Sequence, residues 1–182
     1  KLKFISCEDT PVTELDFSSN PELTSVCAYN SALEYIDVSK NEKLEMLDVS
    51  TCKLTSLDLR NNPALYDLNV YGNNFAWFEL GAKPDLGVEL DNSTIDIEVS
   101  DGSFDITEVF PGIDPAKVSI ISGASIDGNI VSGYTEGIPV TYNYDCGTYE
   151  KGKSVKTCPG TNFFGGNTRE AFEKNLLPLI EK

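Results

Sequence analysis

Apolar residues recur at a strict spacing along the chain from Leu2 to Leu80. Each unit starts with an apolar residue and has two more, three and five positions later (+3 and +5). The units start at Leu2, Val12, Leu23, Leu33, Leu44, Leu54, Leu65 and Phe75, so steps of ten and eleven positions alternate. Two interleaved series of period 21 result, and all 24 positions are free of charge. Repetition of this kind predicts a solenoid of stacked coils.

Each unit is expected to contain one short strand. Side chains alternate along a strand, so the residues at +3 and +5 lie on one face, and the starting residue points into the same core. We therefore predict that the segment 2–80 forms coils whose strands pair one full period apart, with all eight side chains at +3 buried. Proline and asparagine at the corners favour tight turns.

The amino-acid sequence of the units resembles that of the leucine-rich-repeat family, for example in LEYIDVSKN and LTSLDLRNN. It is closest to the 21-residue variant with a nested half-period that is common in bacterial surface proteins. The resemblance covers about residues 1–81 and implies the fold, but it says almost nothing about a ligand. It also implies that small polar residues or cysteine at +8 bond the turn backbone as a ladder. These residues are Thr10, Asn20, Ser31, Asn41, Cys52, Asn62 and Asn73.

The repeat stops at Gly81, and the segment Lys83-Pro84-Asp85 predicts a domain boundary. Residues 87–158 contain short alternating segments such as STIDIEVS and GSFDITEVF, which predict the strands of a small β-sandwich or barrel. Asp127-Gly128 predicts a tight hairpin, and FPGIDPAKV has room for one helical turn. This part resembles the immunoglobulin-like modules that follow leucine-rich repeats in internalin-type bacterial proteins.

The last segment differs from both. PGTNFFGGN predicts a loop, and Asn167 or Thr168 is a suitable N-cap for a helix over REAFEKNLL. The predicted fold class is therefore mainly β. A leucine-rich-repeat solenoid covers residues 1–82, a small β-sandwich (immunoglobulin-like) module covers 83–158, and a loop with a short C-terminal helix covers 159–182.

Composition narrows the function. With 29 acidic and 14 basic residues the net charge is −15, which disfavours nucleic acid and anionic membranes as partners. No apolar run is long enough to span a bilayer, so we expect no membrane insertion. The chain has no histidine and no paired cysteine spacing, so we predict no enzyme, no metal site and no cofactor. A hairpin at GTYEKG would hold Cys146 and Cys158 about 17 Å apart, and only a chain reversal after Lys156 would allow a disulfide.

Candidate site residues lie at the outward positions +2, +4 and +6. Exposed aromatic side chains are typical of binding surfaces, and Tyr29, Tyr35, Tyr71 and Trp77 occupy such positions. Trp77 has an alternative role, which is to cover the open end of the solenoid.

An acidic row forms a second candidate: Asp16, Asp37, Asp58 and Glu79 at +4. These carboxylates either bond Ser18, Ser39 and Arg60 and are otherwise solvated, or they form a stripe for calcium or another cation. Because like charges crowd together, we expect some of their pKa values to rise and the protein to gain stability as pH falls.

These features predict a recognition module that is extracellular or at the cell surface. It would bind a protein or glycan partner through the outer face of the repeats. The alternative is a structural spacer in a larger bacterial surface protein, with no ligand of its own. A hydrolase with paired acids is disfavoured because no loop insertion interrupts the repeats to build a cleft.

Overall fold

The computed structural model describes residues 1–81, 94–97, 99, 102–135, 137–146 and 158–165, the last of these as backbone only. The described residues form two compact units. The first lies within Lys1–Asn92 and Asp145–Pro159, and the second lies within Ser93–Tyr144 and Gly160–Lys182.

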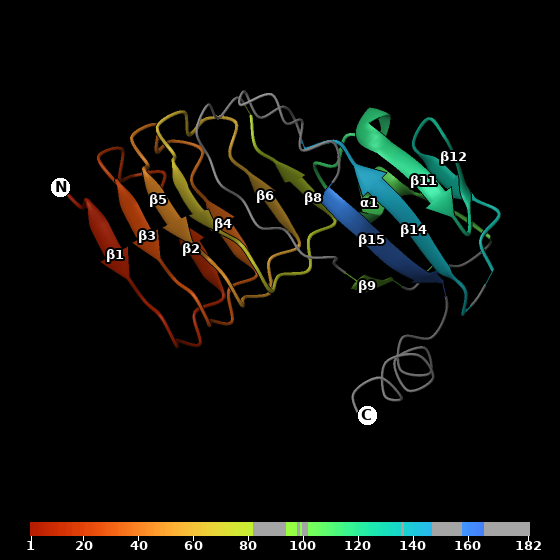
Figure 1. Cartoon of the computed structure of the whole chain (residues 1–182), viewed down its shortest axis with the longest axis horizontal. Helices are drawn as coiled ribbons and strands as arrows, with labels where there is room; N and C mark the ends of the chain where they lie inside the picture. Colours follow the sequence, from red (N-terminus) through yellow and green to blue (C-terminus); the bar gives the residue numbers. More distant parts are fainter. Residues whose placement is uncertain (82–93, 98, 100–101, 136, 147–157, 166–182) are drawn as a thin grey trace. The chain divides into compact units, whose positions relative to one another are not determined.

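The first unit is a β-solenoid of about four turns, and each turn contributes two strands (Figure 1). The strands are β1 (Phe4–Ser6), β2 (Glu14–Asp16), β3 (Ser25–Cys27), β4 (Tyr35–Asp37), β5 (Met46–Asp48), β6 (Ser56–Asp58), β7 (Asp67–Asn69) and β8 (Trp77–Glu79). One series forms a four-stranded sheet in the order β1-β3-β5-β7. The other forms the pairs β2-β4 and β6-β8.

The predicted register is confirmed. All strand pairs of the solenoid are parallel, and partners lie one full period apart, as in Val26↔Leu47 and Leu57↔Phe78. The middle residue of each strand points into the core, which the two series of strands enclose between them.

The core is complete except in the first turn. Six of the eight side chains at +3 are buried, but Ile5 and Leu15 are only half-buried, so the prediction for these two was wrong. Leu2 is also 39% exposed. These residues belong to the first turn, which packs against another turn on one side only.

Polar side chains at +8 form the predicted ladder. The Asn41 side-chain amide donates to the carbonyl oxygens of Phe17 at 3.2 Å and Asn20 at 2.7 Å. The Asn62 amide donates in the same way to Val38 and Asn41, both at 2.9 Å. Each of these four carbonyls also accepts a backbone N–H within its own corner, so the ladder adds a second hydrogen bond that links neighbouring turns.

The other series has a mixed ladder at the same position. The Ser31 hydroxyl donates to the Ala28 carbonyl at 2.8 Å, and the Cys52 thiol donates to the same oxygen at 3.3 Å. The Asn73 amide group donates to Val49 and Val70 at 2.8 and 2.9 Å. Its amide oxygen accepts the Leu54 N–H at 2.9 Å.

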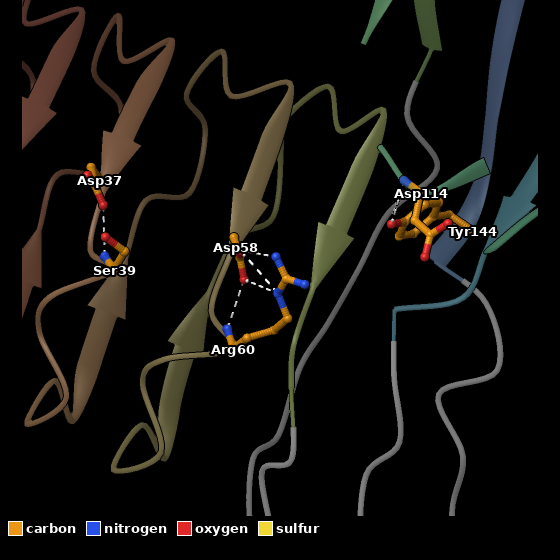
Figure 2. A network of polar contacts seen from close by, with 6 residues as sticks. All are labelled: Asp37, Ser39, Asp58, Arg60, Asp114 and Tyr144. Atoms are coloured by element: carbon orange, nitrogen blue, oxygen red, sulfur yellow. Dashed lines mark hydrogen bonds and ion pairs between the residues drawn. The ribbon is translucent and has the colours of Figure 1, made fainter. Parts of the chain in front are cut away.

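The second unit contains two sheets, in the orders β10-β13-β12 and β11-β14-β15-β9. Its elements are β9 (Thr94–Ile97), β10 (Ser103–Asp105), α1 (Ile106–Val109), the 3-10 turn η1 (Pro115–Lys117), β11 (Val118–Ser122), β12 (Ser125–Asp127), β13 (Ile130–Ser132), β14 (Pro139–Tyr144) and β15 (Cys158–Gly165). The hairpin at Asp127-Gly128 is confirmed, because Asp127 pairs with Ile130. Tyr144 is buried, and its hydroxyl accepts the Asp114 N–H at 3.4 Å (Figure 2).

Two sequence predictions for this part need correction. GSFDITEVF was predicted as one strand, but β10 ends at Asp105 and α1 follows, because the Asp105 side chain accepts the Thr107 N–H at 2.8 Å and caps the helix. The loop predicted over PGTNFFGGN is largely strand β15, which pairs in parallel with β9. The backbone of β15 pairs with a strand that is remote in the sequence. Turn-forming residues within the segment do not reveal this pairing. The helix expected over REAFEKNLL lies outside the described residues.

Cys146 is buried and disulfide-bonded, which settles the question that the sequence left open for this residue. The side chain of Cys158 lies outside the described residues. Cys7, Cys27 and Cys52 are free thiols.

Candidate recognition surface

The outer face of the four-stranded sheet carries three rows of side chains. Within each strand the middle residue is inward, so the first and third residues point outward. A further row follows two positions beyond the strand ends; its Tyr29 and Tyr71 are exposed, whereas its Ser50 is only 9% exposed. The rows are Phe4, Ser25, Met46, Asp67, then Ser6, Cys27, Asp48, Asn69, then Glu8, Tyr29, Ser50, Tyr71. Neighbours within a row are held about 4.8 Å apart by strand pairing.

A shallow depression of about 160 Å³ lies on this face. It is lined by Phe4, Ser25, Cys27, Met46, Asp48 and Asp67, among others. The depression exists because the small Ser25 stands in register between two large side chains. Phe4 is 58% exposed and Met46 is 41% exposed, so both present apolar surface to solvent.

The thiol of Cys27, which lines the depression, is a poor nucleophile. Burial, a hydrogen bond to Glu8 and the negative charge of Glu8 raise the pKa of Cys27 to about 11. Since the thiolate is the nucleophilic form, this cysteine is a neutral lining group at physiological pH.

Carboxylates surround the apolar part of this face. The charge of Glu8 is the main cause that raises the pKa of the Tyr29 hydroxyl, with burial and Asp9 next. Asp48 accepts hydrogen bonds from the Ser50 N–H at 3.0 Å, the Ser50 hydroxyl at 2.6 Å and the Asn69 amide at 3.3 Å.

Basic side chains are absent from the three rows. Of the twelve residues in these rows three are acidic and none is basic. In the described part of the chain the ion pairs are Lys43–Glu22 at 2.8 Å and Arg60–Asp58 at 2.6 Å, and neither involves this face. The face therefore has a negative potential that no lysine or arginine of the described residues neutralises by direct contact.

The aromatic candidates from the sequence divide between the two series. Tyr29 and Tyr71 lie in the third row of the four-stranded sheet and are 40% and 57% exposed. Tyr35 begins β4 in the other series and is 51% exposed, so it does not share their face. Trp77 begins β8 and is only 9% exposed, which leaves little of its ring for a partner.

The acidic row lies on the other series as two pairs, Asp16 beside Asp37 and Asp58 beside Glu79, because β4 and β6 are not paired. Each aspartate accepts the backbone N–H two residues later: Ser18 at 2.7 Å, Ser39 at 2.8 Å and Arg60 at 3.0 Å. Figure 2 shows two of these contacts, and the Arg60 guanidinium also donates to Asp58 at 2.6 Å.

This geometry is an Asx turn, which ends each strand with a side-chain acceptor. It confirms that the aspartates bond Ser18, Ser39 and Arg60, although the backbone N–H is the common donor. Asp48 makes the same bond to Ser50 in the four-stranded sheet. The signal in the sequence was the recurring D-x-S spacing.

The expected rise in pKa is wrong for Asp16. Hydrogen bonds from the Ser18 N–H and the Ser18 hydroxyl lower the pKa of Asp16. A bonded carboxylate favours its ionised form, and this outweighs the crowding of like charges at this exposed position. Among the described residues, no group of three or more acidic or cysteine side chains is arranged to hold a metal ion.

Because the pKa of Asp16 is lowered by folding, its ionised form stabilises the folded state. That contribution is present above the unfolded pKa and is lost as pH falls through the folded pKa. The pKa values of Glu8, Glu22 and Asp105 are lowered as well. We therefore expect the melting temperature to fall as pH drops below about 4, the reverse of the trend expected from the sequence.

The control for this pH dependence is Asp16→Asn, which keeps an acceptor for the Ser18 N–H but no longer titrates. Its melting temperature, followed by circular dichroism, should vary less with pH than that of the wild type. A melting temperature that rises on acidification would contradict the hydrogen-bonded state of these carboxylates.

The parallel strand register with its constant period and the buried side chains at +3 and +5 define a β-solenoid repeat protein whose repeat is similar to a leucine-rich repeat. No family model matches the chain, and no curated protein matches it. Among solved structures it is similar to the functional domain of InlJ from Listeria monocytogenes, which includes a cysteine ladder. The identity is 17% and the TM-score 0.46, over 91% of this chain and 44% of that chain. The chain thus spans less than half of that structure.

No helix in the described residues has the length and apolar character that crossing a membrane requires.

Proposed function

We propose that this chain is a recognition module, extracellular or at the cell surface, that binds a protein or glycan through the outer face of its four-stranded sheet. The observation that carries the proposal is the gathering of large exposed side chains on that face. Phe4, Tyr29, Met46 and Tyr71 are each between 40% and 58% exposed. Aromatic residues and methionine are enriched where proteins bind partners.

A binding role is favoured over catalysis. The sequence has no histidine to act as a general base, and the thiol of the depression has a raised pKa. A repeat solenoid instead supplies an extended and rigid surface, which suits recognition of another macromolecule.

The second unit is proposed to be an immunoglobulin-like β-sandwich. Its two sheets support this, as does a core that includes Ile106, Val131 and Tyr142, all fully buried. The proposed domain limits are 1–82, 83–158 and 159–182. Strand β15 contributes residues of the third segment to the larger sheet.

The proposal is tested by screening the full chain on arrays of extracellular proteins and glycans. The partner that binds should lose affinity at least tenfold when Tyr29 and Tyr71 are both replaced by alanine, because exposed tyrosines that act as hot spots contribute about 1.4 kcal/mol or more. The double variant should fold normally, since neither side chain is part of the core.

Tyr66→Ala is the matched control. Tyr66 is 56% exposed, almost the same as Tyr71, but it precedes β7 at a corner of the coil and lies outside the three rows. Equal losses in Tyr66→Ala and in the double variant would point to a general effect of removing tyrosine. Unchanged affinity in the double variant would remove this face as the binding surface.

A further inference from the structure

We propose that the depression on the four-stranded sheet binds one apolar side chain from a basic segment of a partner protein. This inference rests on the proposed function and specifies the partner. The depression, the apolar rim and the uncompensated acidic groups lie on the same face, and together they select a ligand that is apolar at one point and cationic beside it.

The size of the depression suits a single side chain. A cavity of about 150 Å³ is large enough for a benzene ring, and the depression has a volume of about 160 Å³. Phe4 and Met46 stand on either side of Ser25, so an inserted ring would contact an aromatic face on one side and a flexible thioether on the other. Methionine adapts its shape to such contacts and favours aromatic neighbours.

The negative charge of the surrounding surface favours basic residues on both sides of the inserted side chain of the partner. Asp67 lies next to Met46 in the first row, and Asp48 lies in the second row of the same strand as Met46. Glu8 lies in the third row beside Tyr29. A lysine or arginine on either side of the apolar residue would meet these carboxylates, and the negative surface would attract a basic segment from a distance.

The same features disfavour other partners. Anionic glycans, nucleic acids and acidic lipids would meet a surface with three acidic and no basic outward residues. A neutral sugar would need polar partners for its hydroxyl groups, whereas Phe4, Met46 and the protonated thiol of Cys27 supply mostly apolar contact. A basic peptide segment with one aromatic or aliphatic side chain satisfies both requirements.

The chain offers a direct probe of this site, because Met46 is its only methionine. Labelling with methyl-¹³C methionine gives one resonance from the depression itself. The ligand used is an acetylated and amidated pentapeptide with one phenylalanine between two pairs of lysines. We expect it to shift the Met46 methyl resonance in a saturable way.

Two control peptides separate the apolar and the charged contributions. Replacing phenylalanine with serine, or all four lysines with glutamate, should weaken the binding at least tenfold, which corresponds to the burial of one large side chain or the loss of charge attraction. In the protein, Phe4→Ser should weaken the binding of the first peptide by about the same factor. Tyr35→Ser, a change of similar exposure in the other series, should leave it unchanged.

Equal binding of the serine and phenylalanine peptides would overturn the inference, because charge alone would then explain the interaction. Absence of any saturable Met46 shift would overturn it too. Preferential binding of a neutral glycan at Met46 would also contradict the inference, because the depression would then bind a sugar and not a protein side chain. These outcomes differ from failure of the proposed function. If the Tyr29 and Tyr71 double variant loses its partner but the peptide has no effect at Met46, the four-stranded sheet is still the binding surface. Only the inference of a basic peptide partner would then be wrong.

Discussion

Replacing Leu57 with alanine should lower the free energy of unfolding by about 2–5 kcal/mol, the range measured for truncation of a buried leucine. Leu57 is 2% exposed in the middle of β6, and its strand partner Phe78 is fully buried. The cavity cannot be filled by a shift of one turn alone, since strand pairing holds each turn to its neighbour. Urea denaturation followed by circular dichroism gives the difference.

Leu2→Ala is the control, because the Leu2 side chain belongs to the same pattern of apolar repeat positions but is 39% exposed. Its cost should stay below about 1 kcal/mol, as a half-exposed side chain loses little burial. A loss below about 1 kcal/mol for Leu57→Ala would show that the position is not in the core.

The second large effect is expected at Asn73. Asn73→Ala removes bonds to the Val49 and Val70 carbonyls and to the Leu54 N–H. Each buried polar group left without a partner costs about 1–3 kcal/mol, so the total should be about 3 kcal/mol or more. The same denaturation experiment measures it.

Asn62→Ala provides the comparison, and it should cost less, about 2 kcal/mol. Asn62 donates to two carbonyls, but its own buried amide oxygen has no hydrogen-bond partner. Removing it therefore relieves one unsatisfied group, and the Val38 and Asn41 carbonyls keep the N–H groups of Asn41 and Leu44 as donors. An Asn62→Ala cost equal to or above that of Asn73→Ala would contradict this difference between the two ladders.

Much of the solenoid follows from local pattern. The constant period requires parallel strands in register, and the +3 and +5 rule identifies core residues such as Leu47 and Val49. The pattern does not reveal that Ile5 and Leu15 are half-buried, because burial depends on how many turns stack on a position and not on its place in the repeat.

The second unit follows from the sequence less completely. The hairpin at Asp127-Gly128 is set by a two-residue turn and was predicted. Strand β15 was not, because its backbone partners in β9 lie far away in the sequence, as the pair Asn162↔Thr94 shows. Pairing over such a distance is determined by the whole fold. The turn-forming residues within the segment predict a loop and give no sign of the pairing.

The candidate site was only partly visible in the sequence. Tyr29 and Tyr71 were found from their outward positions, and the structure has both on the four-stranded sheet. Met46, Ser25 and Cys27 were missed, although their positions in the repeat contain the signal. Their importance depends on the sizes of neighbours in one row, which requires reading residues one full period apart as a single surface.

The most direct test of the recognition face is site-specific photo-crosslinking. Benzoylphenylalanine replaces Tyr71 in one variant of the full chain and Tyr35 in another, two tyrosines of similar exposure on different strand series. Each variant is irradiated with the partner found on the arrays. We predict a covalent product from position 71 and none from position 35. Crosslinking from position 35 alone would contradict the account, because it would put the partner on the other series of strands.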